Sequence, residues 1–220
     1  MIPLESPTLT KKARLLQELR RAGIADERVL NAIGHVPREI FIPPMLRDQA
    51  YENVALPIGH GQTISQPLVV AVMTQALELS NRHKVLEVGT GSGYQTTVLA
   101  GLCRRVFSIE RYHPLLREAE KRFAELRLHN IICRFGDGTK GWPEQGPFDR
   151  IIVTAAAAQL PPRLAEGLAP GGILVAPVGE ERRDQQLLRI RRTESGYWTE
   201  NLGSVRFVPL VSGLPREGTA

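Results

Sequence analysis

Three glycines at alternate positions constrain this chain more than any other feature. Val85, Leu86 and Val88 form a short apolar segment, and the glycines follow at positions 89, 91 and 93. Such a segment is typical of a central parallel strand. Glycine permits the positive φ and the close ligand approach that a tight strand-to-helix turn requires. Because residues 94–102 read as an apolar helix, the sequence predicts a strand, a turn and a helix that together cradle a ligand.

The spacing of the glycines favours one class of ligand. A dinucleotide site uses G-x-G-x-x-G and places a pyrophosphate at the helix N-terminus. This chain has G-x-G-x-G instead, with Glu87 two residues before the first glycine. A carboxylate there repels a pyrophosphate and suits a cation, so S-adenosylmethionine, with its sulfonium and ammonium groups, fits better. A tight turn that binds nothing is the other interpretation, since glycine turns alone are weak signals.

Two further acids follow later strands. Residues 105–109 form the next apolar segment and end at Glu110. A carboxylate about 20 residues past a glycine turn accepts hydrogen bonds from ribose hydroxyls. Asp137 follows residues 131–133 and is expected to face the same crevice. Each acid has a simpler interpretation, as a helix-start acid for Glu110 and an Asp-Gly turn for Asp137. Next to the glycine turn, we favour ligand binding for both.

Composition limits the classes of protein to which the chain can belong. The 220 residues suit one large domain or a domain with an extension, and 23% charged and 42% hydrophobic residues are ordinary for a globular protein. No apolar run approaches the ~18 residues of a membrane span. The N-terminus lacks the basic and apolar regions of a signal peptide. Cys103 and Cys133 lie in apolar contexts, so we expect buried thiols in a reducing cytoplasm.

The net charge of +5 and the isoelectric point near 9.6 raise the question of nucleic-acid binding. The basic residues are scattered and mixed with acids. Even the densest cluster, residues 182–192, contains Asp184 and falls in an expected hairpin, so a solvated face is the favoured interpretation. We therefore expect no nucleic-acid partner, although a positive surface attracts substrates that carry carboxylates.

The order of the expected elements indicates an α/β fold. Residues 8–50 read as short helices, 51–65 as a loop and 67–79 as an apolar helix. A second helix is expected to begin after Asp26 and to stop at Gly34. From residue 84 onward strands and helices alternate, which argues for a parallel sheet with helices on both faces. Strands are expected at 84–88, 105–109, 131–135, 149–154 and 172–178, and helices near 93–103, 114–128 and 161–169.

Two further strands end the chain. Residues 186–192 and 204–210 are expected to be extended, and the turn at 194–196 predicts that they pair antiparallel. The expected fold is a Rossmann-like, mostly parallel seven-stranded sheet with an antiparallel C-terminal hairpin. Residues 1–80 would form a helical extension that carries a substrate loop, and residues 81–220 the cofactor-binding domain. This arrangement is that of the common methyltransferase fold.

The segment Gln62-Thr63-Ile64-Ser65-Gln66-Pro67 is more specific than the glycine motif, which alone indicates only a methyltransferase. Further motifs accompany it at 36–38, 56–59, 86–95, 109–111, 136–138, 141–142, 147–149, 153–156 and 206–210. Together they make the chain similar to the protein-L-isoaspartate O-methyltransferases over about residues 15–210. Departures are few: Ala158-Gln159 stands where many relatives have Pro-Glu, and His60 occupies a variable loop position.

The resemblance implies an enzyme that transfers the methyl group of S-adenosyl-L-methionine to the free carboxyl of L-isoaspartyl residues in damaged proteins and peptides. S-adenosyl-L-homocysteine is then released, and repair begins through a succinimide. The resemblance also implies that Glu87 and the glycine turn hold the methionine part of the cofactor, that Glu110 holds the ribose, and that Asp137 and Gly138 lie by the adenine. It implies that the antiparallel last strand is inserted beside the fifth. A cytoplasmic monomer is expected.

The site residues expected on this basis fall into two groups. Ser65 is expected to be catalytic and to contact the substrate carboxylate, beside Thr63, Ile64 and Val211. The residues expected to contact the cofactor are Glu87, Gly89, Thr90, Gly91, Ser92, Gly93, Glu110, Arg111, Asp137 and Gly138. No metal is expected, because the sequence lacks the clustered acids of a metal-dependent methyltransferase.

Methylation of a carboxylate requires few catalytic groups from the protein. A carboxylate with a reference pKa of about 4 is already ionised at neutral pH, so no general base is required. Positioning two charged reactants and excluding water then matter most. Because proline is favoured in a first helical turn, Ser65, just before Gln66-Pro67, is expected at a helix N-cap, where an anion is favourable. The alternative is a hydroxyl that only caps the helix.

Two other functions stay open from the sequence alone. The first is methylation of another acceptor. Residues 153–156 argue against nucleobase amino groups, because they lack the Asn/Asp-Pro-Pro-Tyr/Phe sequence of the enzymes that methylate them. Carbon methylation of cytosine is also disfavoured, because no cysteine lies beside that strand. A non-catalytic cofactor-binding or RNA-binding module is favoured by the isoelectric point. The intact Ser65 loop argues against it.

Overall fold

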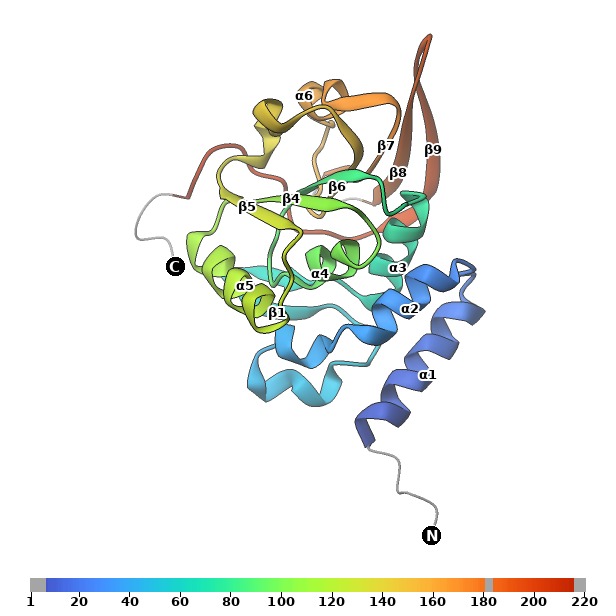
Figure 1. Cartoon of the computed structure of the whole chain (residues 1–220), viewed down its shortest axis with the longest axis vertical. Coiled ribbons are helices and arrows are strands. Elements are labelled where there is room, and N and C mark those ends of the chain that lie inside the picture. The colour runs from blue at the N-terminus through green and yellow to red at the C-terminus, as the bar shows by residue number, and fades with distance from the viewer. Residues whose placement is uncertain (1–6, 181–183, 216–220) are drawn as a thin grey trace.

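A seven-stranded sheet forms the centre of the computed structural model, which describes residues 7–180 and 184–215 (Figure 1). The strand order is β5-β4-β3-β6-β7-β8-β9, parallel from β5 to β7 and antiparallel from β7 to β9. These strands are β3 (Lys84–Val88), β4 (Arg105–Glu110), β5 (Ile131–Phe135), β6 (Phe148–Val153), β7 (Leu168–Val178), β8 (Gln185–Thr193) and β9 (Gly196–Val205). The mostly parallel sheet with an antiparallel C-terminal hairpin is therefore confirmed.

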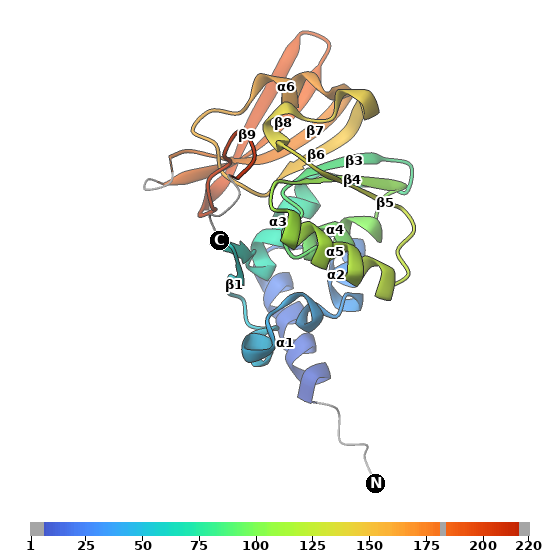
Figure 2. The ribbon, with the colours of Figure 1, turned by 90° about the vertical axis from the view of Figure 1, so that its left-hand side faces the viewer.

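Helices cover both faces of this sheet (Figure 2). They are α3 (Pro67–Ala76), α4 (Tyr94–Ala100) and α5 (His113–Glu125) on one face and α6 (Pro162–Glu166) on the other. Met73 of α3 and Leu99 of α4 share a buried cluster with Val85 of β3. Leu164 of α6 packs with Leu86 in a second cluster, because side chains alternate across a strand. The helix α6 is shorter than the expected 161–169, because β7 already begins at Leu168.

The N-terminal segments form a further layer against the helices. They are α1 (Pro7–Arg21), α2 (Glu27–His35) and the 3-10 helices η1 (Arg38–Phe41) and η2 (Pro44–Gln49). Asp26 caps α2 by accepting the N–H of Arg28, as expected. The helix runs one residue past Gly34, so the expected stop there is wrong. Apolar side chains of this layer share a buried cluster with Tyr94 and Val98 of α4.

The expected loop at 51–65 contains a small β-hairpin, so that prediction is wrong in part. Strands β1 (Leu56–Gly59) and β2 (Gln62–Ile64) pair antiparallel. His60 and Gly61 form the turn with φ of 52° and 66°. Positive φ at both turn positions matches the twist of a tight hairpin. Histidine is not a strong signal for such a turn, and proline and glycine in β1 hide the strand.

The C-terminal hairpin corrects two predictions. The last strand is β9, which begins at Gly196 and ends at Val205, and not at 204–210. It also lies at the sheet edge beside β8, so insertion beside the fifth strand is wrong. The tight turn at 194–195 explains both outcomes, since a strand that leaves such a turn pairs with its predecessor. Residues 206–210 leave the sheet and pair with the segment after β6 through a bridge between Ala156 and Pro209.

Two 3-10 turns complete the described elements, η3 (Gly138–Lys140) and η4 (Pro143–Gln145), both between β5 and β6. In the described ranges, no helix has the length and apolar character needed to cross a membrane.

Candidate active site

The glycine turn has no room for side chains at its first and last glycines. Gly89, Gly91 and Gly93 all have positive φ, of 99°, 54° and 90°. A Cβ on Gly89 would lie 2.3 Å from Thr154 Oγ1, and that hydroxyl donates to the carbonyls of Val88 and Gly89. A Cβ on Gly93 would lie 2.7 Å from the Phe123 ring of α5. The turn thus needs glycine both for its backbone conformation and for the space around it.

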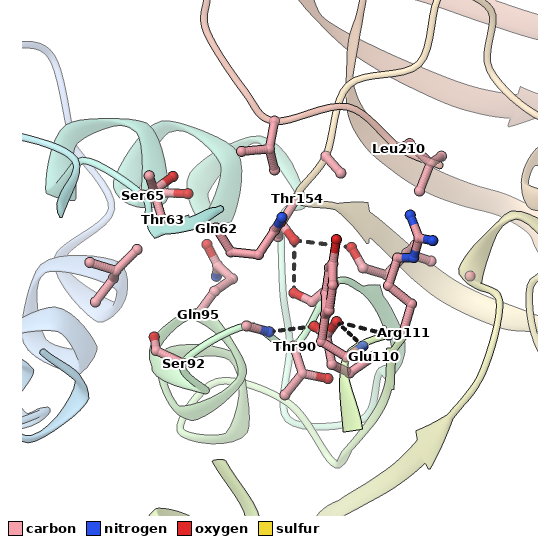
Figure 3. Close-up of a pocket in the computed structure, with 18 of the residues that line it drawn as sticks. Gln62, Thr63, Ser65, Thr90, Ser92, Gln95, Glu110, Arg111, Thr154 and Leu210 are labelled. Atoms are coloured by element: carbon pink, nitrogen blue, oxygen red, sulfur yellow. Dashed lines mark hydrogen bonds between the residues drawn. The ribbon is translucent and has the colours of Figure 1, made fainter. Parts of the chain in front are cut away.

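A cavity lies at the carboxyl ends of β3, β4 and β6, where open α/β sheets bind ligands (Figure 3). Its walls come from the glycine turn, the end of β2 and the segment after β9. The expected site residues that line it are Thr63, Ile64, Ser65, Gly89, Thr90, Gly91, Ser92, Glu110, Arg111, Gly138 and Val211. Glu87, Gly93 and Asp137 do not line it.

Glu110 lines the cavity and braces the glycine turn. Its Oε2 accepts the N–H of Gly91 at 2.8 Å, and its Oε1 accepts the N–H groups of Arg111 and Tyr112 at 2.8 and 2.9 Å. Burial raises the pKa of this carboxyl above its ordinary value, although the three N–H donors and the Arg111 charge act in the opposite direction. These bonds fix the carboxylate at the end of β4, and they leave acceptor capacity because each oxygen has two lone pairs.

Glu87 lies behind the cavity wall and reaches it through hydroxyl groups. Its side chain is completely buried, and its Oε2 accepts from Thr96 Oγ1 at 2.5 Å and from Ser108 Oγ at 2.6 Å. Since the Ser108 hydroxyl donates to Glu87, the cavity-lining Thr90 donates to Ser108 Oγ at 2.6 Å. Burial raises the pKa of Glu87 to about 8, against the two hydroxyl donors. Its Oε1 has no hydrogen-bond partner in the described part of the chain.

Asp137 holds local structure rather than the cavity surface. Its Oδ1 accepts the N–H and the hydroxyl of Thr139, and its Oδ2 accepts the N–H of Gly213 at 2.8 Å. Partial burial raises the pKa of Asp137, but these donors outweigh it and leave the pKa below its ordinary value. The residue therefore ties the segment after β9 to the end of β5. Gly138 beside it does line the cavity, and a Cβ there would lie 2.3 Å from Val88 Cγ1.

Ser65 does not sit at the helix N-cap, so that prediction is wrong. The N-cap of α3 is Gln66, with ψ of 135°, and Pro67 is the first helical residue. The residue before a proline is pushed into extended geometry, which moves the cap one position along the chain. The Ser65 hydroxyl forms no hydrogen bond with another described residue, and it lines the cavity from the hairpin side (Figure 3). The hydroxyl is thus available to a ligand.

Sequence reasoning missed several residues that line the cavity. Tyr112 does so, and its ring stacks on His60 at the hairpin turn with centroids 5.7 Å apart. Thr154 follows β6, so its position at a strand end was the available signal. Val88, Ile109 and Ala155 carry the same signal, since they lie at the ends of β3, β4 and β6. The others, which carry no comparable signal, are Gln62, Val70, Tyr94, Gln95, Val208, Pro209 and Leu210.

The basic cluster and the cysteines are consistent with structural roles. Arg182 and Arg183 lie outside the described residues. Arg191 Nη2 lies 2.9 Å from each carboxylate oxygen of Glu78, which is an exposed pair rather than a free basic patch. Cys103 is buried as expected, whereas Cys133 is only half-buried because β5 lies at the edge of the sheet. Burial raises the pKa of both thiols to about 12, which disfavours the reactive thiolate. Within the described ranges, no group of three or more His, Cys, Asp or Glu is placed to hold a metal.

Comparison with known proteins adds an independent line of evidence. The family model described as protein-L-isoaspartate (D-aspartate) O-methyltransferase matches residues 10–215. A protein-L-isoaspartate O-methyltransferase of Rhodospirillum centenum is 58% identical, over 96% of this chain and 96% of its own length. That of Paramagnetospirillum magneticum is 60% identical, over 93% of this chain and 96% of its own.

A solved structure from Plasmodium falciparum, assigned as a protein-L-isoaspartate O-methyltransferase, was determined in complex with S-adenosyl-L-homocysteine. It is 29% identical and covers 91% of this chain and 98% of its own, with a TM-score of 0.78.

Proposed function

The chain belongs to the protein-L-isoaspartate (D-aspartate) O-methyltransferase family, and we propose that the cavity beside the glycine turn is its active site. The enzyme transfers the methyl group of S-adenosylmethionine to the free carboxyl of L-isoaspartyl residues in damaged proteins, which starts their repair through a succinimide. One observation carries the assignment of the site. A single cavity collects the glycine turn, the Glu110 carboxylate and the Ser65 hydroxyl from segments far apart in the sequence.

The residues around this cavity fit S-adenosylmethionine. Gly89 and Gly91 leave the backbone accessible, and the Glu110 carboxylate is placed to accept ribose hydroxyls. Gly138, which has no room for a side chain, would border the adenine, and Asp137 would support that border from behind. Thr90, Ser92 and Arg111 complete the proposed cofactor set, and Gly93 would support it from behind by packing the turn against α5. When bound, S-adenosylmethionine supplies an electrophilic methyl group carried on a sulfonium.

We propose an indirect role for Glu87. Its carboxyl does not reach the cavity, but Thr90 and Ser108 connect it to the wall through hydroxyl groups. A cation near that wall would favour the ionised carboxylate, because opposite charges lower the pKa of an acid. The residue thus favours the cationic part of the cofactor through a hydrogen-bonded chain.

Ser65 is proposed to orient the acceptor carboxylate. Thr63 and Ser65 line both the cofactor cavity and a second cavity, which is formed with Gln66 and the segment 204–208. A carboxylate that enters from the second cavity would therefore meet the cofactor at Ser65. The carboxylate is ionised at neutral pH, so the protein has no proton to remove. Ile64 and Val211 complete the proposed substrate contacts.

Methyl transfer to a matched pair of peptides tests this proposal. One peptide has a normal aspartyl linkage and the other an isoaspartyl linkage, and labelled S-adenosylmethionine is supplied to wild type and to Ser65→Ala. We expect base-labile methylation of the isoaspartyl peptide only. Loss of a hydrogen bond to a charged group should lower kcat/KM for the Ser65→Ala variant by about 10- to 100-fold. Binding of S-adenosylhomocysteine is the control and should not change. Equal kcat/KM in both proteins would remove Ser65 from the mechanism.

We further propose that residues 1–80 act as an extension that places the substrate loop, while residues 81–220 hold the cofactor. The cluster that the N-terminal layer shares with α4 supports packing of this extension on the cofactor-binding part. We also propose a cytoplasmic monomer without a nucleic-acid partner. Sedimentation equilibrium and binding to labelled RNA at low salt test the last two points, since a nucleic-acid protein binds strongly and loses affinity steeply as salt rises.

A further inference from the structure

Arg38 is a charged side chain buried in an apolar region. It begins η1, is only 1% exposed, and lies beside the apolar cluster of the N-terminal layer. Its guanidinium carbon lies 4.5 Å from the centre of the Tyr94 ring. Its Nη2 donates to the backbone carbonyl of Ser65 at 2.8 Å. Both neighbours, Ser65 and Tyr94, line the cofactor cavity, so the guanidinium lies directly behind that wall.

This charge has no counter-ion among the described residues. Nε and Nη1 of Arg38 have no hydrogen-bond partner there, and no carboxylate forms an ion pair with it. The adjacent Glu39 accepts the hydroxyl of Tyr51 instead, at 2.5 Å. Burial lowers the pKa of Arg38, although Tyr94 and Tyr51 act in the opposite direction. A buried, unpaired cation is costly to keep, so its presence calls for an anion nearby in the working enzyme.

The peptide between Ser65 and Gln66 connects this charge to the acceptor side. Arg38 binds its carbonyl oxygen. Because a trans peptide is planar, its N–H points the opposite way, away from Arg38. A donor on the oxygen polarises the same peptide and strengthens its N–H as a donor. Ser65 and Gln66 both line the second cavity, from which the acceptor is proposed to enter.

We propose that Arg38 is a positioning residue that makes the site selective for an anionic acceptor, by fixing the Ser65 peptide and by placing an unpaired positive charge behind it. This inference rests on the proposed site, and it adds the source of its charge selectivity. Arg38 does not touch the reacting atoms. Its charge favours the ionised carboxyl of an isoaspartyl residue over a neutral group of the same shape.

Two peptides that differ only in charge test this inference. One carries isoaspartate with its free carboxyl, and the other carries the matching carboxamide, isoasparagine. Their dissociation constants are measured by calorimetry with saturating S-adenosylhomocysteine. Wild type should prefer the carboxylate. Arg38→Gln keeps a donor for the Ser65 carbonyl but loses the charge. We expect its preference for the carboxylate over the carboxamide to fall by about tenfold, because charges interact more strongly in a site shielded from water. Arg38→Lys keeps the charge and should keep most of the preference.

Arg122→Gln is the matched control. Arg122 of α5 is also a partly buried guanidinium, and it donates to the carbonyl of the cavity residue Ser92 at 3.1 Å. Its loss should leave the ratio of the two dissociation constants unchanged. In all variants, melting temperature and S-adenosylhomocysteine affinity report whether the fold and the cofactor site are intact.

Specific results would overturn the inference. Arg38→Gln with the wild-type ratio, or with equal losses for both peptides, would leave Arg38 a structural role only. If Arg38→Gln does not fold, a folded Arg38→Lys that lacks the preference would likewise overturn the inference. Failure of the wild type to bind the isoaspartyl peptide would instead count against the proposed site, whatever Arg38 does.

Discussion

At the residue scale, Glu87 gives the clearest prediction. Its pKa in the folded protein is about 8, above its ordinary value of 4.5, so between these pH values the folded protein holds a proton that the unfolded chain has lost. The group therefore costs stability as pH rises from about 5 to 8. Glu87→Gln does not titrate. Without cofactor, the free energy of unfolding of wild type should fall by roughly 3 kcal/mol relative to that of Glu87→Gln across that range, as the size of the pKa shift implies.

Urea denaturation at several pH values measures this difference. Substitution of the exposed Glu118 of α5 by glutamine is the control, because a surface carboxylate paired with Lys121 contributes little to the free energy of unfolding. Parallel pH profiles for wild type and Glu87→Gln would show that the carboxyl is ionised in the folded state.

The sequence predicted site residues best where their position at a strand end places them at the cavity. Gly89, Gly91 and Glu110 line the cavity because parallel strands bring their carboxyl ends to one edge. Ser65 also lines it, but it follows the antiparallel strand β2 and was expected there from the family resemblance. The sequence could not show that Glu87 faces α4 instead of the cavity, since both faces of a buried strand are apolar. Nor did it single out Arg38, whose proposed role depends on the lack of a counter-charge among the described residues.

At the scale of elements, an aromatic contact helps to join the hairpin β1–β2 to the cofactor side. His60 at its turn stacks on Tyr112, and the N–H of Tyr112 donates to Glu110. Asparagine also tolerates positive φ, so His60→Asn removes the ring without straining the turn. Loss of such a contact should weaken S-adenosylhomocysteine binding by about two- to tenfold.

Calorimetry with wild type, His60→Asn and a His129→Asn control tests this contact, since His129 is exposed and outside the cavity. Identical affinities would mean that the hairpin does not support the cofactor site. The hairpin itself escaped prediction because its turn uses histidine at positive φ and its strands are short. Strands β3 and β5 were predicted to the residue, because apolar runs between helices leave few alternatives.

At the scale of the whole molecule, the parallel part of the sheet was predictable and the order of the last strands was not. Alternating strands and helices argue for parallel pairing, and β3 to β7 pair in this way. The position of β9 depends on a short turn, whereas the expected insertion came from the common methyltransferase order. Because β9 lies at the edge, residues 206–211 run back from the sheet to the cavity. A C-terminal segment thus lines a cavity whose other walls come from earlier parts of the chain.

Gln185 at the start of β8 fixes that return. Its amide is fully buried, with Nε2 donating to the Phe207 carbonyl at 3.1 Å and Oε1 accepting the Phe207 N–H at 2.6 Å. The next residues then bond to Ala156, through the Val208 carbonyl and the Leu210 N–H, and line the cavity. Gln185→Leu leaves both polar groups of Phe207 buried without partners, which should cost about 2–4 kcal/mol of unfolding free energy.

The same variant should also raise KM for the isoaspartyl peptide, because the wall formed by residues 208–211 loses its anchor. The neighbouring Gln186 offers a matched control, since the bonds of its amide to other described residues are to Ser204 and Asn201 of β9. Gln186→Leu should stay within about 0.5 kcal/mol of wild type. Denaturation and peptide kinetics on the pair separate the two effects. If Gln185→Leu loses stability but keeps its KM, the bonds to Ala156 and Asp137 suffice to hold the segment after β9, and Gln185 of β8 has no part in shaping the site.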